Sequence, residues 1–232
     1  MLATDILTAA RTWRPAMFGD RRAAEIDDPL VEPLWTGPRV LAIVADGTAS
    51  MTDEDGDPVE GRDEIRAELV EDAGGSTLLL EGVLTGEPLQ QPEQVAARVA
   101  VNVPKPGQMA SQLLVGDRSG RKEQLEARLD DVRRRQADDP SRDAALVAVD
   151  LLWLDDQSLC DVPLLERKRV LESVLRESSL VRVGTYVRPP IDGWLGAWRM
   201  FGFRRLSFKG ANSRYVPGAR NRDWAQAEIP RR

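Results

Sequence analysis

The chain has 232 residues, which allows one large domain or two small ones. Apolar residues make up 42% and charged residues 30%, a balance typical of soluble globular proteins and not of disordered ones. No run approaches the length of about 18 apolar residues that a membrane-spanning helix needs, and the N-terminus does not resemble a secretory signal. A single cysteine, Cys160, excludes an internal disulfide and predicts a cytoplasmic location.

Histidine is absent and lysine is scarce. The lack of histidine excludes Ser-His-Asp triads, Cys-His dyads and zinc sites that use histidine, and one cysteine cannot build a cysteine-rich zinc site. We therefore expect no metal site of these kinds. A mechanism that needs a lysine nucleophile has four candidates, namely Lys105, Lys122, Lys168 and Lys209.

Charge is distributed unevenly along the chain. The overall net charge is −6, yet the segment from Arg199 to Arg232 holds nine basic and two acidic residues, a net +7, so the first 198 residues carry −13. Such a basic segment either contacts phosphate groups or only balances an acidic body.

The first 84 residues alternate between helical and strand patterns. Apolar spacing and turn residues predict a helix over 3–14 with Thr4 as its cap, a hairpin over 40–52 that turns at Asp46-Gly47, a helix over 62–71, and a strand over 77–84.

The rest of the chain predicts the same mixture of elements. We expect a strand over 95–103, a charged surface helix over 121–136, a buried strand over 144–154, an amphipathic helix over 164–175, a strand over 181–187, an aromatic helix over 193–201, and strands over 203–209 and 223–229. This order predicts an α+β fold with antiparallel sheets. No glycine-rich strand-to-helix turn indicates a Rossmann or P-loop site.

Three stretches, in this order, resemble motifs of the adenylation domain of ATP-dependent DNA ligases, and most closely the bacterial end-joining type. EPLWTGPRVL (32–41) resembles "EPKWDGxRVL", and VDLLWLD (149–155) with PLLERK (163–168) resembles "FDLLYLDG…PLxxRKxxLE". The segment from Lys209 to Trp224 resembles "KxxxSxYxPGxRxxDW". The likeness covers about 31–229, so we expect a single domain over 1–232, with 85–140 as a candidate insertion.

The resemblance implies the nucleotidyltransferase fold of DNA ligases and mRNA-capping enzymes, an ATP-grasp-like fold with antiparallel sheets flanked by helices. It implies ATP and Mg²⁺ as cofactors and a lysine that attacks the α-phosphate of ATP. The sequence ends directly after the last motif, so we expect the family's C-terminal oligonucleotide-binding barrel to be absent from it.

The chain departs from the family's motifs at each chemical position. Leu34 stands in place of the nucleophilic lysine, and a leucine has no lone pair that could form a lysyl-AMP bond. Thr36 replaces the aspartate of the same motif, Val83 replaces the ribose-side glutamate, and Val149 replaces the phenylalanine that stacks on the base. Arg204 with Arg205 replaces the pair that includes the metal-binding carboxylate, and Gln226 with Glu228 replaces the two lysines that hold the triphosphate. A cation in place of the metal-binding carboxylate would repel Mg²⁺.

Some positions retain the family's residue. By resemblance, the candidate nucleotide contacts are Glu32, Trp35, Arg39 and Lys209, although Arg39 could equally form an ion pair within the fold and Lys209 could be a solvated strand lysine. The candidate nucleic-acid contacts are Arg199, Arg204, Arg205, Arg214, Arg220 and Arg222. We expect Asp150 and Arg167 to form a structural pair, and Tyr215 and Trp224 to lie in the core.

Three functions fit this pattern. The first is a degenerate pseudo-ligase related to DNA repair that binds DNA or a repair partner. The second is an active nucleotidyltransferase with altered catalytic residues, and the third is a nucleotide-sensing or scaffold module. The salt bridges of the cleft bear on this choice: a pair between Arg204 and Glu81 or Glu228 would close the site, whereas unpaired Arg39 and Lys209 would keep it open to anions.

Overall fold

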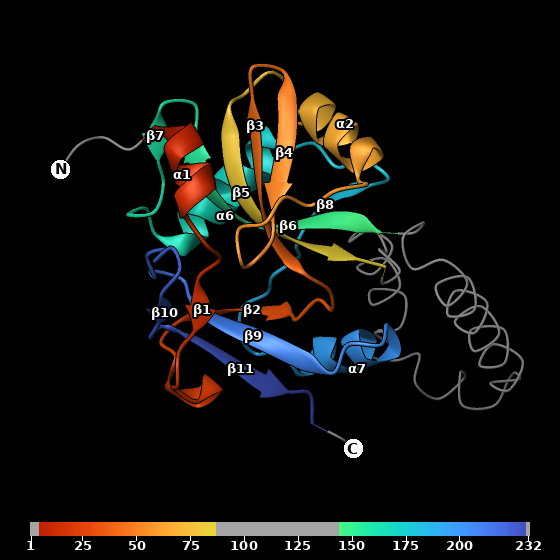
Figure 1. The fold of residues 1–232 in the computed structure, drawn as a ribbon. Helices are drawn as coiled ribbons and strands as arrows, with labels where there is room; N and C mark the ends of the chain where they lie inside the picture. The colour runs from red at the N-terminus through yellow and green to blue at the C-terminus, as the bar shows by residue number, and fades with distance from the viewer. Residues whose placement is uncertain (1–4, 87–143, 231–232) are drawn as a thin grey trace, which may run out of the picture. The chain divides into compact units, whose positions relative to one another are not determined.

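The computed structural model describes residues 5–86 and 144–230. The larger of its two main sheets has the strand order β4-β3-β5-β6-β7, and β8 pairs with β6 (Figure 1). Its strands are β3 (Arg39–Ala45), β4 (Thr48–Thr52), β5 (Leu78–Thr85), β6 (Ala145–Leu154), β7 (Gln157–Ser158) and β8 (Val181–Val183). The pairs are antiparallel except for β6 with β8, which is parallel. The expected strand over 95–103, the helix over 121–136 and the candidate insertion beyond residue 86 lie outside the described residues.

The predicted hairpin over 40–52 is confirmed. Asp46 and Gly47 both have positive φ, 51° and 70°, which is the backbone that a two-residue hairpin turn needs and that Asp-Gly adopts readily. The turn sets the register that places Val44 opposite Ala49. The predicted strands over 77–84 and 144–154 are confirmed as β5 and β6, and both are almost fully buried.

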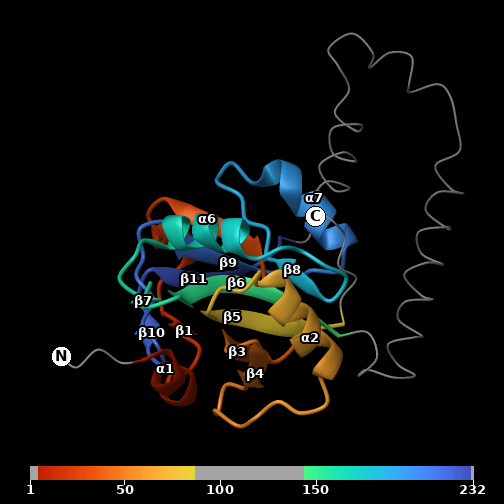
Figure 2. The same cartoon turned by 90° about the horizontal axis from the view of Figure 1, so that it is seen from above.

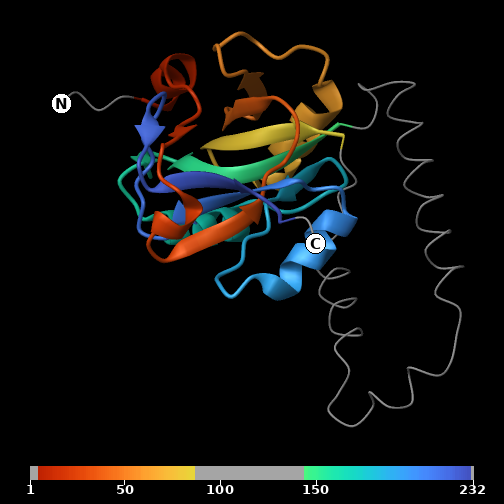
Figure 3. The ribbon, with the colours of Figure 1, turned by 90° about the horizontal axis from the view of Figure 1, so that it is seen from below.

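The smaller sheet has the order β11-β9-β2, and Figure 3 shows it from below. Its strands are β2 (Pro29–Pro33), β9 (Arg205–Gly210) and β11 (Trp224–Glu228), all antiparallel. The sequence patterns missed β2 because it begins and ends with proline. Proline is tolerated there because β2 is an edge strand: β9 pairs with it on one side, and on the other side the described chain makes only a single bridge, between Val187 and Val31. A short parallel pair joins β1 (Met17–Phe18) to β10 (Arg220–Asn221).

Four α-helices and one 3₁₀ turn occur among the described residues. They are α1 (Ile6–Thr12), α2 (Asp63–Asp72), α6 (Leu164–Val174), α7 (Asp192–Met200) and the turn η1 (Ala23–Glu25). Helix α6 packs against β6, as the view from above shows (Figure 2). No helix in the described ranges is long and apolar enough to cross a membrane.

Two expectations about these elements need correction. The cap of α1 is Asp5, whose carboxylate accepts the backbone N–H of Thr8 at 2.7 Å, and not Thr4, which lies outside the described residues. The strand predicted over 181–187 extends only over Val181–Val183. Beyond it the chain leaves the large sheet, and Val187 forms a single bridge to Val31 of β2.

The smaller sheet has two different faces. On one face, Val31 and Leu206 pack with Trp198 of α7 in an apolar cluster. On the other face, which alternates with the first along each strand, Glu32 and Lys209 lie close together. The second face therefore carries two of the four candidate nucleotide contacts, Glu32 and Lys209.

Candidate functional site

Glu32 lies between two buried lysines on the polar face of the smaller sheet. Lys209 Nζ is 3.2 Å from Glu32 Oε2, and Lys168 Nζ of α6 is in ion-pair contact with Glu32 Oε1. Lys168 is fully buried, and Glu32 and Lys209 are each 4% exposed. Neither Lys168 Nζ nor Glu32 Oε1 has a further hydrogen-bond partner among the described residues. The ion pair between Lys168 Nζ and Glu32 Oε1 is thus the main interaction that offsets the cost of burying these two charged atoms.

Neighbouring groups decide the ionisation of Glu32. Burial opposes its charge, but the ammonium groups of Lys168 and Lys209 outweigh that effect and lower the pKa of the carboxyl below its usual value. Lys209 Nζ also lies 4.5 Å from the ring centroid of Trp224, and Lys168 Nζ lies 5.7 Å from that of Tyr186. Both lysines are therefore held by the fold and are withdrawn from solvent.

Arg39 is likewise engaged inside the protein. Its guanidinium donates to Glu81 Oε1 through Nη2 at 2.5 Å and through Nε at 3.1 Å, and it also donates to the Ala16 carbonyl at 2.6 Å. Tyr215 donates its hydroxyl hydrogen to the other carboxylate oxygen of Glu81 at 2.6 Å and accepts the backbone N–H of Ala16 at 2.9 Å. Burial, followed by the charge of Glu81, raises the pKa of Tyr215 well above its usual value, so the phenol stays protonated.

The salt bridges of the cleft match neither of the two arrangements that were weighed from the sequence. Glu81 pairs with Arg39 and not with Arg204, because β3 and β5 are neighbours and Leu41 lies opposite Glu81 in the register. Arg39 is two residues along β3 and reaches Glu81 diagonally. Both Arg39 and Lys209 thus have carboxylate partners, and neither is left free for an anion.

Replacing Tyr215 by phenylalanine tests this network. We expect the free energy of unfolding to fall by about 2 kcal/mol, because a buried hydrogen bond to a charged group is lost and the Ala16 N–H loses its acceptor. Tyr186→Phe is the matched control: Tyr186 is only partly buried and its hydroxyl makes no hydrogen bond to a described residue, so a change within about 0.5 kcal/mol is expected. Urea unfolding followed by circular dichroism measures both, and equal losses would contradict the assignment.

Asp150 and Arg167 form the expected structural pair. Arg167 donates from Nε to Asp150 Oδ1 at 2.8 Å and from Nη2 to Oδ2 at 2.7 Å, and both side chains are fully buried. Its third nitrogen, Nη1, donates to the carbonyls of Val162 and Ser213. The pair joins β6 to α6 and to the loop before β10, so its role is to hold the elements around the site.

The residues that differ from the ligase motifs are divided between the smaller and the larger sheet. Leu34 directly follows β2, and its backbone N–H bonds to the carbonyl of Arg205 at the start of β9. Gln226 of β11 accepts a hydrogen bond from the Arg205 side chain. On the larger sheet, Val83 and Val149 are buried and present no polar group.

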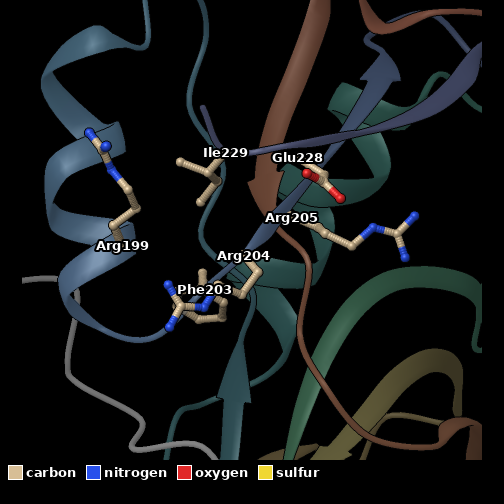
Figure 4. Close-up of a pocket in the computed structure, with 6 residues that line it drawn as sticks. All are labelled: Arg199, Phe203, Arg204, Arg205, Glu228 and Ile229. Atoms are coloured by element: carbon tan, nitrogen blue, oxygen red, sulfur yellow. The ribbon is translucent and has the colours of Figure 1, made fainter. Parts of the chain in front are cut away.

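A pocket opens where α7 meets the ends of β9 and β11. It has a cavity volume of about 540 Å³ and is lined by Arg199, Phe203, Arg204, Arg205, Glu228 and Ile229. Figure 4 shows Arg199 and Arg204 on one side, while Arg205 extends away from them toward the side of Glu228. The other candidate nucleotide contact, Trp35, packs edge-on against Phe203 with ring centroids 4.8 Å apart.

The structure divides the six predicted nucleic-acid contacts into two groups. Arg199, Arg204 and Arg205 line the pocket. Arg214, Arg220 and Arg222 lie at the other end of β11, around β10, where Arg214 pairs with Asp161 at 3.0 Å and Arg220 with Asp20 at 2.6 Å. These exposed pairs offset the charges of Arg214 and Arg220.

The residues of the site do not fit a catalytic Mg²⁺ ion. No group of three or more acidic, histidine or cysteine side chains that could hold a metal occurs in the parts of the chain that the structure describes. Near the expected metal position, Arg204 and Arg205 contribute positive charge, which repels a divalent cation. We therefore assign no step to a metal ion in this chain.

Comparison with solved structures identifies the fold. The ligase domain of LigD from M. tuberculosis is 18% identical, with a TM-score of 0.60 over 94% of this chain and 60% of that one. A mycobacterial DNA ligase D complexed with ATP and MES is 20% identical, with a TM-score of 0.61 over the same shares of the two chains. A structure of the Lig E DNA ligases is 12% identical, with a TM-score of 0.51 over 93% of this chain and 68% of that one.

The chain has the fold of a DNA ligase domain. This DNA ligase fold is the one expected from the motifs, with antiparallel sheets and flanking helices. The chain spans about 60% of the length of the two LigD structures. No protein-family model matches the sequence, and the search of curated proteins gives no match.

Sequence reasoning missed two contributors to this ligase-fold site. Lys168 belongs to a motif and is one of the four lysines in the chain, but its ion pair with Glu32 was not predicted, although a buried lysine almost always has a charged partner. From the sequence, Glu81 was considered only as a possible partner of Arg204. Its role as the anchor of Arg39 and Tyr215 depends on contacts between residues that are 42 and 134 positions apart.

Proposed function

We propose that this chain is a cytoplasmic pseudo-ligase: a DNA ligase fold related to DNA repair that binds DNA or a repair partner without forming an enzyme–AMP intermediate. The single domain over 1–232 remains part of this proposal. The observation that carries it is the Lys168–Glu32–Lys209 cluster, together with leucine at position 34. Lys168 and Lys209, the two lysines in the described part of the chain, are both buried and form ion pairs with Glu32.

A nucleophilic amine must be neutral and must reach the α-phosphate of ATP. Lys168 and Lys209 are each held against a carboxylate whose lowered pKa favours the charged pair, so neither presents a free amine. The remaining lysines, Lys105 and Lys122, lie outside the described residues. The alternative of an active nucleotidyltransferase therefore has no support from the described part of the site.

Intact-mass measurement after incubation with ATP and Mg²⁺ or Mn²⁺ tests the proposal. We expect the mass of the wild-type protein to be unchanged with either metal. Leu34→Lys is also expected to stay unmodified, because a lysine at position 34 would still lack a metal carboxylate and the cations of the triphosphate position.

The two measurements have separate consequences. An AMP adduct on the wild-type chain would overturn the proposal and favour an active enzyme. An adduct on Leu34→Lys alone would show that the remaining residues still support adenylation, so that the loss is confined to one side chain.

A further inference from the structure

Strand β11 leaves part of its outer edge open. It is the last strand of the smaller sheet, and among the described strands it pairs only with β9. The bond from the Ile229 N–H to the Arg204 carbonyl fixes which residues of this antiparallel ladder bond to β9. The alternation that follows from it turns the backbone N–H and C=O groups of Gln226 and Glu228 toward the outer edge.

The first residue of β11 is covered, whereas the rest of its outer edge is not. The Gly19 N–H donates to the Trp224 carbonyl at 2.9 Å, which closes the edge at that end. No described residue bonds to the outward backbone groups of Gln226 or Glu228. A row of unpaired N–H and C=O groups at a sheet edge can accept a further strand from another chain.

Arg199 and Arg204 stand beside the open end of this edge. Arg199 donates from Nε to the Leu195 carbonyl and from Nη1 to the Pro230 carbonyl, both at 3.1 Å. Arg204 is exposed, and its side chain makes no hydrogen bond or ion pair within the described ranges. Figure 4 shows both arginines on the side of α7, whereas Arg205 extends away from them. Since carbonyl groups do not neutralise a guanidinium, no described residue compensates either charge.

An added strand would meet different groups on the two faces of the sheet. Ile229, which packs with α7, lies directly across from Arg204, so these two residues share the α7 face. Gln226 and Glu228 lie on the other face, where Gln226 is bonded to the Arg205 side chain. An acidic side chain is therefore attracted on the α7 face by the arginines and repelled on the other face by Glu228.

The chemistry of this edge favours a peptide over a nucleic-acid strand. Phe203 and Ile229, which lie beside the arginines, are only 6% and 5% exposed, so neither offers a surface on which a base could stack. The alternating donors and acceptors of an open edge match a peptide backbone, which a nucleic-acid strand does not reproduce. Guanidinium groups bind carboxylates through paired N–H donors, so the matching peptide is acidic.

We propose that the open edge of β11 binds an extended acidic segment of a partner protein, which adds a strand at Gln226 and Glu228 and places carboxylates on Arg199 and Arg204. This binding rests on the proposed function, because it names the chemistry of the partner that the pseudo-ligase binds. Only every second side chain of the added strand lies on the α7 face, so the preferred segment carries its acids at alternate positions.

The first test is fluorescence anisotropy of the full chain with a labelled short peptide in which glutamate and threonine alternate. We expect binding that weakens as salt is added. Two N-methylated versions of the peptide, one methylated at every threonine and one at every glutamate, probe the strand pairing. Only every second residue of a paired strand donates to its neighbour, so one version should lose binding and the other should bind within about threefold of the unmethylated peptide.

The second test uses variants of the edge and of its charge. Gln226→Pro removes an outward N–H without breaking the ladder with β9, and should weaken binding roughly tenfold, whereas Gln226→Ala keeps this N–H and should change it less than about threefold. Arg204→Ala should weaken binding about tenfold, because a charged contact is lost. Arg222→Ala removes the same charge at the other end of β11 and should change binding less than about twofold. Circular dichroism melting checks the folding of each variant, and the methylated peptides decide the matter if Gln226→Pro does not fold.

The other outcomes count against the proposal. No binding of the alternating peptide, equal losses for Arg204→Ala and Arg222→Ala, or equal effects of the two methylated peptides would overturn it. Displacement of the peptide by a lower concentration of single-stranded oligonucleotide than of unlabelled peptide would assign the surface to nucleic acid instead. Self-association of the chain that blocks the peptide would assign the edge to a second copy. An AMP adduct in the mass measurement would overturn the proposed function and leave the peptide result unaffected, so the two failures are distinguishable.

Discussion

Replacing Arg167 by alanine is expected to lower the free energy of unfolding by about 3–5 kcal/mol, which is a large part of the stability of a typical domain. Arg167 and Asp150 are both fully buried and are joined by two hydrogen bonds of 2.8 and 2.7 Å. Removing the guanidinium leaves a buried carboxylate without its counter-ion and also leaves the Val162 and Ser213 carbonyls without a donor. The melting temperature should fall by roughly 10 °C.

Two further variants make this prediction decisive. Arg169→Ala is the matched control on the same helix: its exposed pair with Glu166 should contribute less than about 0.5 kcal/mol. Arg167→Lys keeps the charge but cannot make the two parallel bonds, so it should lie between the wild type and the alanine variant. A melting temperature for Arg167→Ala within a few degrees of that for Arg169→Ala would show that the pair does not hold the domain together.

Glu32→Gln should cost a similar amount, about 3–5 kcal/mol at neutral pH, because it leaves Lys168 and Lys209 buried without a negative partner. The double variant Glu32→Gln/Lys168→Met should recover part of this loss, since it also removes the fully buried excess cation. Glu228→Gln is the control, because Glu228 is exposed. Urea unfolding of the wild type, Glu32→Gln, Lys168→Met and the double variant gives the coupling energy between Glu32 and Lys168.

The same carboxylate gives a pH dependence of known sign. The pKa of Glu32 is lower in the folded protein than its usual value of 4.5, so the unfolded chain binds the proton more readily. The stability that Glu32 contributes is therefore fully present above about pH 5 and is lost as the pH falls through the folded pKa. The gap between wild type and Glu32→Gln should stay constant from pH 8 to about pH 5 and narrow below that. A gap that widens on acidification would contradict the ion-pair assignment.

The two Glu32 predictions concern the charged groups on the polar face of the smaller sheet. Arg39 and Lys209 would be natural contacts for a nucleotide, but each is already paired with a carboxylate of its own chain. Glu32 and Glu81 thus provide from within the protein the negative charge that a phosphate ligand would supply. This arrangement explains why the chain can hold a ligase-like site together without relying on the nucleotide for charge balance.

Much of the local structure follows from the sequence. The β-branched run before Asp46-Gly47 predicts the β3–β4 hairpin, and the apolar spacing after Pro163 predicts α6, because both signals arise between residues close in the chain. Strand β2 could not be predicted from local preference. Its prolines are poor strand residues, and only the pairing with β9, some 175 positions later, gives it a place at a sheet edge.

The sequence by itself determined that position 34 carries no amine, that only four lysines are available, and that the motifs resemble those of DNA ligases. Only the tertiary structure decided which charges meet. The +7 segment looked like one basic surface, yet the turn between β9 and β11 places Arg204 beside α7 and Arg222 at the other end of the sheet. Charge pairing depends on the distance in space between side chains, and that distance is set by strand register and by which face of a strand each residue occupies.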